Sequence, residues 1–185
     1  MTDIFLTSTP GSADAAEPHL ILVGLPGSGK SSVGRGLAKQ LGRSFLDFDV
    51  EIARREGASV PEIFERHGEP YFRAREVQLT LELGVRGGMV LAPGGGWIMS
   101  PSVSALLRPP GRIIYLKLSP ERALKRLGEA RGQRPLLASE DPGRELERLL
   151  REREPTYLTA DDVVMVGELS LRETVQAVLQ LAPPK

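Results

Sequence analysis

Short apolar runs alternate with longer amphipathic segments along most of this chain. The apolar runs at which we expect β-strands are residues 19–23, 44–48, 89–92, 112–118 and 162–166. Apolar residues spaced three and four apart predict helices between them. We place these helices at about residues 30–41, 49–55, 60–67, 69–86, 101–107, 120–127, 142–154 and 170–181. Strands that alternate with helices predict an α/β fold in three layers, with a parallel sheet covered by helices on both faces.

The chain of 185 residues has the length of one globular domain, which we place at residues 19–185. Residues 1–18 contain acidic, Ser, Thr, Ala and Pro residues and lack a basic segment followed by a long apolar run, so we interpret them as a flexible tail. The segment at about residues 128–142 is polar and contains several Gly and Pro residues. It suits a mobile lid, and a plain solvated connection is the alternative.

The composition disfavours several classes of protein. The 24 basic residues balance 24 acidic ones, so no strong positive field favours nucleic acid or an anionic membrane surface. The absence of cysteine removes disulfides, thiolate nucleophiles and cysteine-based metal sites, and it suits a cytoplasmic protein. No uninterrupted apolar run approaches the roughly 20 residues that a membrane-spanning helix needs. We therefore expect a soluble protein that binds anions locally.

The segment 24–31 fits the pattern G-x-x-x-x-G-K-[ST], directly after a predicted strand and at the start of a predicted helix. Its glycines let backbone N–H groups point at phosphate oxygens, and the helix presents its positive end to the same anion. We expect Lys30 to reach the β- and γ-phosphates and Ser31 to ligate the Mg²⁺ that bridges them. A chance glycine-rich turn is the alternative. A serine hydrolase is disfavoured because Pro26 stands where its nucleophile elbow needs glycine.

Two carboxylates follow the second predicted strand. Asp47 and Asp49 are two residues apart, so in extended chain they project to the same side. Both can then face the crevice beyond the strand ends, where open α/β sheets bind ligands. Asp47 suits a metal ion, and Asp49 suits a hydrogen bond from an attacking hydroxyl. The alternative for Asp49 is an N-cap of the helix that follows it.

Charged residues also fall on apolar faces of predicted helices. Arg73 and Glu76 are three residues apart in one helix, and Arg153 lies on an apolar face of another. Arg73 and Glu76 could simply pair, or Glu76 could hold Arg73 so that its guanidinium clamps an anionic substrate. Arg153 is a candidate for a second clamp. The triple glycine 94–96 follows the third predicted strand and favours either close approach of the backbone to a ligand or a flexible turn.

In this order and spacing, these motifs resemble those of shikimate kinases from about residue 19 to residue 181. The resemblance rests on segments 24–31, 47–49, 72–76, 94–96 and 134–137 together with Arg153. It implies a P-loop kinase with a five-stranded parallel sheet and a mobile lid. The implied activity is transfer of the γ-phosphoryl group of ATP to the 3-hydroxyl of shikimate, with Mg²⁺ as cofactor, in aromatic amino-acid biosynthesis. We also expect a monomer.

The resemblance assigns roles on the acceptor side of the site. It implies that Asp49 contacts the shikimate hydroxyls and takes the transferred proton. Arg73 and Arg153 would grip the shikimate carboxylate, beside Gly95 and Gly96.

On the nucleotide side, the resemblance implies that Asp47 and Ser31 hold Mg²⁺. Arg134 is expected on the lid, over the migrating phosphoryl group, and Arg126 near the adenine. With Lys30 and Asp49, Arg134 completes the predicted catalytic set. The predicted ATP-binding residues are Gly27, Ser28, Gly29, Lys30, Ser31, Ser32, Arg126 and Arg134.

The chain departs from the family pattern in its N-terminal tail, in a longer stretch between Arg126 and Arg134, and in Trp97 after the triple glycine. Two rival functions remain open. A kinase of another small hydroxylated acid, such as gluconate, could use the same loop and aspartate. A non-catalytic module could bind ATP to order segment 128–142 for a partner.

Overall fold

A parallel sheet forms the centre of the molecule. The structure is a computed structural model, and it describes residues 17–128, 137 and 141–182. Within these residues the sheet has five strands in the order β2-β3-β1-β4-β5, all paired in parallel. The strands are β1 (Leu20–Val23), β2 (Phe45–Asp47), β3 (Val90–Ala92), β4 (Arg112–Lys117) and β5 (Asp162–Met165). Each strand lies in an apolar run that predicts it, and the α/β fold class is confirmed.

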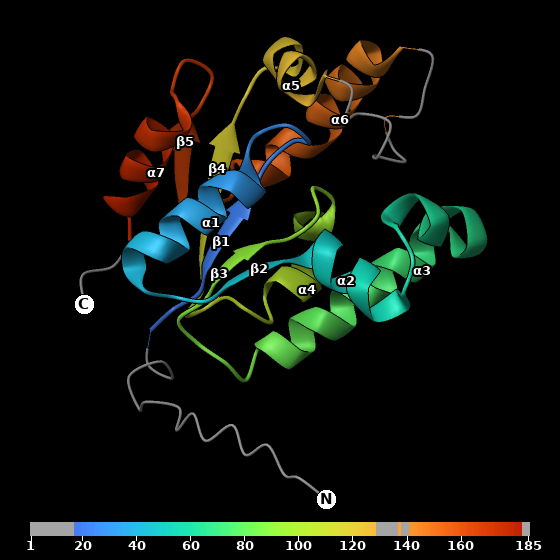
Figure 1. The fold of residues 1–185 in the computed structure, drawn as a ribbon, viewed down its shortest axis with the longest axis horizontal. Helices are drawn as coiled ribbons and strands as arrows, with labels where there is room; N and C mark the ends of the chain where they lie inside the picture. Colours follow the sequence, from blue (N-terminus) through green and yellow to red (C-terminus); the bar gives the residue numbers. More distant parts are fainter. Residues whose placement is uncertain (1–16, 129–136, 138–140, 183–185) are drawn as a thin grey trace, which may run out of the picture.

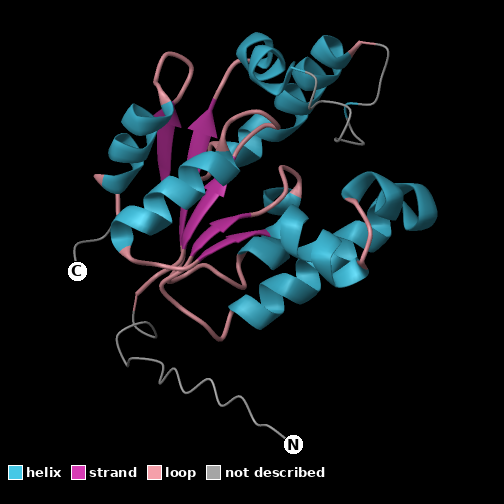
Figure 2. Ribbon diagram, in the orientation of Figure 1, coloured by secondary structure: helices cyan, strands magenta, loops and turns pink. Residues whose placement is uncertain are grey.

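Helices cover the sheet on both faces, which gives the expected three layers (Figures 1 and 2). The helices are α1 (Lys30–Leu41), α2 (Phe48–Glu56), α3 (Val60–Leu83), α4 (Pro101–Ser104), α5 (Pro120–Leu127), α6 (Pro142–Tyr157) and α7 (Leu171–Leu179), with a short 3-10 helix η1 (Trp97–Met99). In Figure 1, α1 lies in front of the strands beside α7, and α6 runs behind them. All four residues of β1 are buried, as expected for a central strand covered on both faces.

Two helix boundaries show how local sequence controls the path of the chain. The two helices expected at 60–67 and 69–86 form the single element α3, which is interrupted at Gly68, whose φ of 79° and ψ of 171° are not helical. Helix α2 begins at Phe48 because the side chain of Asp47 accepts hydrogen bonds from the N–H groups of Asp49 and Val50. The N-cap is therefore Asp47, and the alternative reading of Asp49 as the cap is wrong.

The ends of the domain differ slightly from expectation. Glu17, which the sequence analysis places in the tail, pairs with Arg43 at 2.5 Å, and the carbonyl group of Pro18 accepts a hydrogen bond from Arg43 at 3.2 Å. The rest of the tail and most of the predicted lid, including Arg134, lie outside the described residues. Within the described part of the chain, no helix is long and apolar enough to cross a membrane.

Candidate functional site

The glycine-rich segment 24–31 joins β1 to α1, as its motif predicts. Gly24, Gly27 and Gly29 have φ angles of 145°, 82° and 97°, which side-chain-bearing residues rarely adopt. A Cβ atom on Gly24 would lie 2.7 Å from the carbonyl oxygen of Leu116, and one on Gly27 would lie 2.7 Å from that of Ala123. The loop is thus pressed against the end of β4 and against α5, and it leads directly into the N-terminus of α1, where backbone N–H groups favour an anion.

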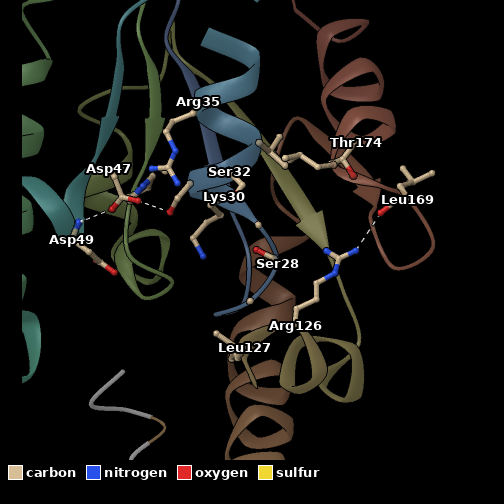
Figure 3. Close-up of a pocket in the computed structure, with 17 residues that line it drawn as sticks. Ser28, Lys30, Ser32, Arg35, Asp47, Asp49, Arg126, Leu127, Leu169 and Thr174 are labelled. Atoms are coloured by element: carbon tan, nitrogen blue, oxygen red, sulfur yellow. Dashed lines mark hydrogen bonds between the residues drawn. The ribbon is translucent and has the colours of Figure 1, made fainter. Parts of the chain in front are cut away.

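Lys30, the first residue of α1, lies over this loop. Its ammonium group donates hydrogen bonds to the carbonyl oxygens of Gly24 at 2.9 Å and Leu25 at 3.1 Å. Figure 3 shows this group pointing into the cavity that the loop borders. The arrangement places a positive charge beside the concave side of the loop.

Ser31 and the two aspartates lie together next to the loop. The Ser31 hydroxyl donates a short hydrogen bond to Oδ2 of Asp47, while Oδ1 of Asp47 accepts one from the Asp49 N–H at 3.1 Å. Asp49 lies in the first turn of α2. Within the described residues, no group of three or more His, Cys, Asp or Glu side chains gathers as a metal cage. The hydroxyl and carboxylate oxygens of Ser31 and Asp47 are nevertheless the hard ligands that Mg²⁺ prefers when phosphate oxygens complete its shell.

Two adjoining cavities share these residues. A cavity of about 570 Å³ is bordered by the loop, Ser32, Arg126 and residues of α7, and a second of about 660 Å³ is bordered by Arg73, Arg153 and the triple glycine. The residues that border both cavities are Ser31, Arg35, Asp47 and Asp49. Figure 3 shows Asp47 and Asp49 on the opposite side of the loop from Arg126. The predicted nucleotide and acceptor residues thus separate into two chambers, with both carboxylates at their junction.

Arg73 is held by two carboxylates of its own helix. Nη1 lies 2.6 Å from Oε2 of Glu76, and Nη2 lies 2.6 Å from Oε1 of Glu69. The Glu76 side chain is only 2% exposed, whereas that of Glu69 is 45% exposed. Burial raises the pKa of Glu76, against the opposing effect of the neighbouring Arg73 charge. Burial alone would lower the pKa of Arg73, but the carboxylates of Glu76 and Glu69 outweigh it and raise that pKa.

These contacts bear on the two readings of Arg73. Arg73 pairs with Glu76, as the reading of a simple ion pair predicts. It also borders the second cavity, as a side chain that clamps a substrate must. The two readings are therefore compatible, because a guanidinium has five N–H donors and its two carboxylate contacts do not use them all.

The triple glycine follows β3 and packs closely on charged side chains. A Cβ atom on Gly94 would lie 2.5 Å from Oε1 of Glu76, and one on Gly96 would lie 2.6 Å from Nη2 of Arg73. At Gly95 a Cβ atom would lie 3.2 Å from Nη1 of Arg153, which is itself only 8% exposed. The glycines allow the backbone to approach these groups, so close approach rather than a loose turn explains their presence.

Several residues at the site were missed by reasoning from the sequence. Arg35 borders both cavities, and its position one helical turn after Ser31 is a signal that could have found it. The apolar wall of the second cavity includes Val60, Phe64 and Phe72, whose spacing is indistinguishable from that of core residues.

Arg126, which the sequence analysis places near the adenine, borders the first cavity and donates a hydrogen bond to the carbonyl oxygen of Val166 at 2.5 Å. Its contact with adenine stays a prediction.

The two histidines lie outside both cavities. His19 is buried, and its ring joins the carbonyl oxygen of Leu83 at 3.2 Å to the N–H of Met89 at 3.3 Å. His67 stacks on Tyr71 with ring centroids 4.5 Å apart. Neither histidine is therefore placed to act as a base at this site.

The geometry suits transfer of a phosphoryl group between two ligands. One chamber offers a backbone anion site, a lysine and a hydroxyl–carboxylate pair, which are the groups that hold a nucleoside triphosphate and its metal ion. The other offers two arginines and an apolar wall, which favour a small organic acid. Asp49, at the junction, can accept a proton from a hydroxyl of that acid.

The matching family model and two relatives of more than 40% identity belong to one family. The family model described as shikimate kinase matches residues 26–182. A shikimate kinase of Parasynechococcus marenigrum (strain WH8102) is 43% identical over 164 residues, which cover 89% of this chain and 85% of that protein. The solved structure of a shikimate kinase from Acinetobacter baumannii in complex with shikimate is 41% identical, with a TM-score of 0.85, and the match covers 90% of this chain and 93% of that one.

A more distant likeness bears on the rival kinase. The structure of a gluconokinase from Sinorhizobium meliloti 1021 is 22% identical, with a TM-score of 0.57, and the match covers 89% of this chain and 93% of that one. At this level of identity the likeness extends to the fold alone.

Proposed function

The chain belongs to the shikimate kinase family, and from this premise we propose that it transfers the γ-phosphoryl group of ATP to the 3-hydroxyl of shikimate, giving 3-phosphoshikimate and ADP. The observation that carries the proposal is the position of Asp49. It borders both the chamber of the phosphate loop and the chamber that contains Arg73 and Arg153. A group that moves from a nucleotide to an organic acid must cross this junction.

In this proposal the triphosphate of ATP lies along the loop 24–31. Backbone N–H groups of the loop and the N-terminus of α1 bind its oxygens, and Lys30 turns from the loop carbonyls toward the β- and γ-phosphates. Ser28 and Ser32 border the same chamber. Arg126 borders its far side, where the adenine is expected. Arg134, outside the described residues, is proposed to close over the migrating group.

Ser31 and Asp47 would hold Mg²⁺ at the junction. Their oxygens are adjacent, and Asp47 is fixed because it also caps α2. When bound, the ion supplies charge neutralisation across the β- and γ-phosphates. The capping bonds keep the Asp47 carboxylate in one orientation, so this chain provides a preformed oxygen pair for the ion.

The acceptor is proposed to bind through its carboxylate. Arg73 and Arg153 border the second chamber from α3 and α6, and the guanidinium of each can form charge-assisted hydrogen bonds to a carboxylate. Glu76 and Glu69 hold the Arg73 side chain, which reduces the entropy lost when the acid binds. With the carboxylate held at one end, the acceptor hydroxyl can reach Asp49 at the other.

Asp49 then orients the hydroxyl and takes its proton as the hydroxyl oxygen attacks phosphorus. No covalent enzyme intermediate is needed, because positioning and electrostatic stabilisation supply the catalysis in this class of reaction. The buried Glu76 carboxyl lies against the triple glycine, and burial, with a smaller contribution from the Asp49 charge, raises its pKa.

The test is a coupled assay of ADP release. We expect rapid release only when ATP, Mg²⁺ and shikimate are all present, and slow release with gluconate or with water as the acceptor. Equal rates with gluconate would favour the rival kinase. ATP binding without turnover of either acid would favour the ATP-sensing module.

Oligomeric state and location complete the proposal. We propose that the enzyme works as a monomer in the cytoplasm, because both chambers are formed within one chain and a chain without cysteine suits a reducing compartment. Sedimentation of the purified protein checks the first part, and fractionation of the source cell checks the second.

A further inference from the structure

Tyr157 is a buried residue behind the wall of the second chamber, the one bordered by Arg73, Arg153 and the triple glycine, which we call the acceptor chamber. It is the last residue of α6, one helical turn after Arg153, and it is fully buried. It borders neither cavity. Its hydroxyl donates a hydrogen bond of 2.7 Å to the carbonyl oxygen of Gly95, the middle residue of the triple glycine.

Gly95 is the point at which three segments meet. A Cβ atom placed on it would lie 3.2 Å from Nη1 of Arg153, 3.2 Å from the carbonyl oxygen of Gly24 and 3.3 Å from the Tyr157 hydroxyl. The Gly24 carbonyl is also the one that accepts a hydrogen bond from Lys30. The Tyr157 hydroxyl therefore lies where the triple glycine 94–96, α6 and the start of the phosphate loop come together.

A second tyrosine provides a contrast within the same packing unit. Tyr115, on β4, stacks on Tyr157 with ring centroids 4.9 Å apart and an interplanar angle of 29°. Both residues are 0% exposed. The Tyr115 hydroxyl, however, has no hydrogen-bond partner among the residues that the structure describes. Both rings are buried in one stack, and of the two hydroxyls only that of Tyr157 is bonded to a residue of the site.

We propose that Tyr157 is a positioning residue for the acceptor. Its hydroxyl fixes the Gly95 carbonyl beside Arg153, and so it holds the triple glycine 94–96 and the carboxylate-binding Arg153 in a fixed position relative to each other. The proposal rests on the proposed function, because it assigns Arg153 and Gly95 to acceptor binding. Tyr157 acts through these two residues.

The physical reason lies in the glycine sequence itself. Three consecutive glycines have a large conformational entropy and no side chains by which to anchor themselves. Within the described residues, the two ends of the loop are held first by backbone contacts: the backbone N–H of Trp97 donates to the Gly94 carbonyl at 3.0 Å, that of Met99 donates to the Gly96 carbonyl at 3.1 Å, and the Gly94 N–H donates to Glu76. The Tyr157 hydroxyl is the second anchor, at the central Gly95. Without the second anchor, part of the acceptor's binding energy would be used to order the loop. Once the acceptor is bound the loop is ordered again, so the change should appear in affinity rather than in turnover.

The matched variants Tyr157→Phe and Tyr115→Phe test this. Each removes one buried hydroxyl and keeps the stacked ring. We expect Tyr157→Phe to raise the KM for shikimate about 3- to 10-fold, with kcat and the KM for ATP changed by less than about twofold. Tyr115→Phe should leave all three constants unchanged. Melting temperatures measured alongside show whether both variants are folded.

A direct binding measurement complements the kinetics. Trp97, the single tryptophan of the chain, follows Gly96, and its indole N–H donates to the Thr80 hydroxyl at 2.9 Å. Because Trp97 is next to Gly96, which borders the acceptor chamber, its fluorescence should report acceptor binding. Tyr157→Phe should raise the Kd for shikimate, measured in this way, by the same factor as the KM.

Two results would overturn the inference while leaving the proposed function in place. One is an unchanged shikimate KM in folded Tyr157→Phe. The other is a parallel rise in the KM values for shikimate and ATP, which would indicate a general structural role. If the wild-type enzyme does not phosphorylate shikimate at all, the proposed function fails first, and this inference fails with it.

Discussion

The phosphate loop and the acceptor chamber adjoin each other, yet they are built in different ways. The loop is one continuous segment, 24–31, and it offers mainly backbone N–H groups, with Lys30 and Ser31 at its end. The acceptor chamber takes its charged groups from α1, β2, α2, α3 and α6, which extend over most of the chain. One part is a local conformation, and the other exists only when the whole domain has folded.

The difference indicates which residues each part depends on. A backbone site depends on glycines that permit the loop conformation, and few of its side chains need support. A site made of buried charges depends on the partners that hold those charges, such as Glu76 for Arg73 and Tyr157 for the wall beside Arg153. Substitutions on the acceptor side should therefore affect acceptor binding and leave nucleotide binding intact.

The largest expected effect is at the junction of the two parts. Asp49→Asn keeps the size of the side chain and leaves the N-cap at Asp47 in place, but the amide cannot take the hydroxyl proton. We expect turnover to fall by about 10²- to 10⁴-fold. ATP affinity and melting temperature should change little.

The control for Asp49→Asn is Glu51→Gln on the same helix, where the carboxylate pairs with Arg54 at 2.9 Å outside both cavities. Its turnover should match the wild type. Near-normal turnover in Asp49→Asn would remove the general-base role and leave this residue at most a positioning function.

The next largest effect is at the two arginines. Arg73→Ala and Arg153→Ala each remove a charge-assisted contact worth about 1.5–3 kcal/mol, which corresponds to a rise of about 10- to 150-fold in the KM for shikimate. The KM for ATP should stay close to that of the wild type. Arg75→Ala is the control, because Arg75 pairs with Glu56 at 2.9 Å away from the acceptor. Loss of ATP binding in the first two variants would place these arginines on the nucleotide side.

A smaller effect separates the two carboxylates that hold Arg73. Glu76→Gln removes the buried partner, and we expect the KM for shikimate to rise about tenfold and the free energy of unfolding to fall by about 1–3 kcal/mol. Glu69→Gln removes the exposed partner and should change the KM by less than about twofold. Equal effects in the two variants would show that burial of the Arg73–Glu76 pair has no role in presenting the guanidinium.

The smallest effect is expected at the N-terminus. Deletion of residues 1–9 should leave turnover and melting temperature unchanged, because this stretch precedes the first strand and its sequence has no pattern of core residues. A lowered melting temperature, measured by calorimetry, would show that the first residues pack on the domain.

Sequence alone predicts the phosphate side of this site better than the acceptor side. The glycine pattern, the strand before it and the helix after it are local signals, and the strand–helix alternation predicts the parallel sheet. Asp47 borders both cavities, and its role toward a metal ion stays a prediction. The sequence offers an N-cap only as the alternative for Asp49, since spacing alone cannot tell which of two aspartates has the extended backbone of an N-cap, and the structure shows that it is Asp47.

The acceptor side needs tertiary information. Helical periodicity identifies Arg73 and Arg153 as charges on apolar faces, but it cannot show that α3 and α6 bring them to one chamber. Phe64 and Phe72 look like core residues in the sequence, and Tyr157 appears only as an apolar position of α6. Their roles arise from the sheet order, which brings the loop after β3 beside β1 and close to α6.

The central claim is that the arginines of the acceptor chamber hold the shikimate carboxylate while the 3-hydroxyl meets Asp49. Its most direct test is the ratio of kcat/KM for shikimate to that for shikimate methyl ester, measured in the wild type and in Arg73→Ala. The wild type should prefer the acid by at least about tenfold, because the ester lacks the charge that the arginines bind. In Arg73→Ala this preference should shrink markedly. An equal preference in both proteins would contradict the account, because the carboxylate would then be recognised elsewhere.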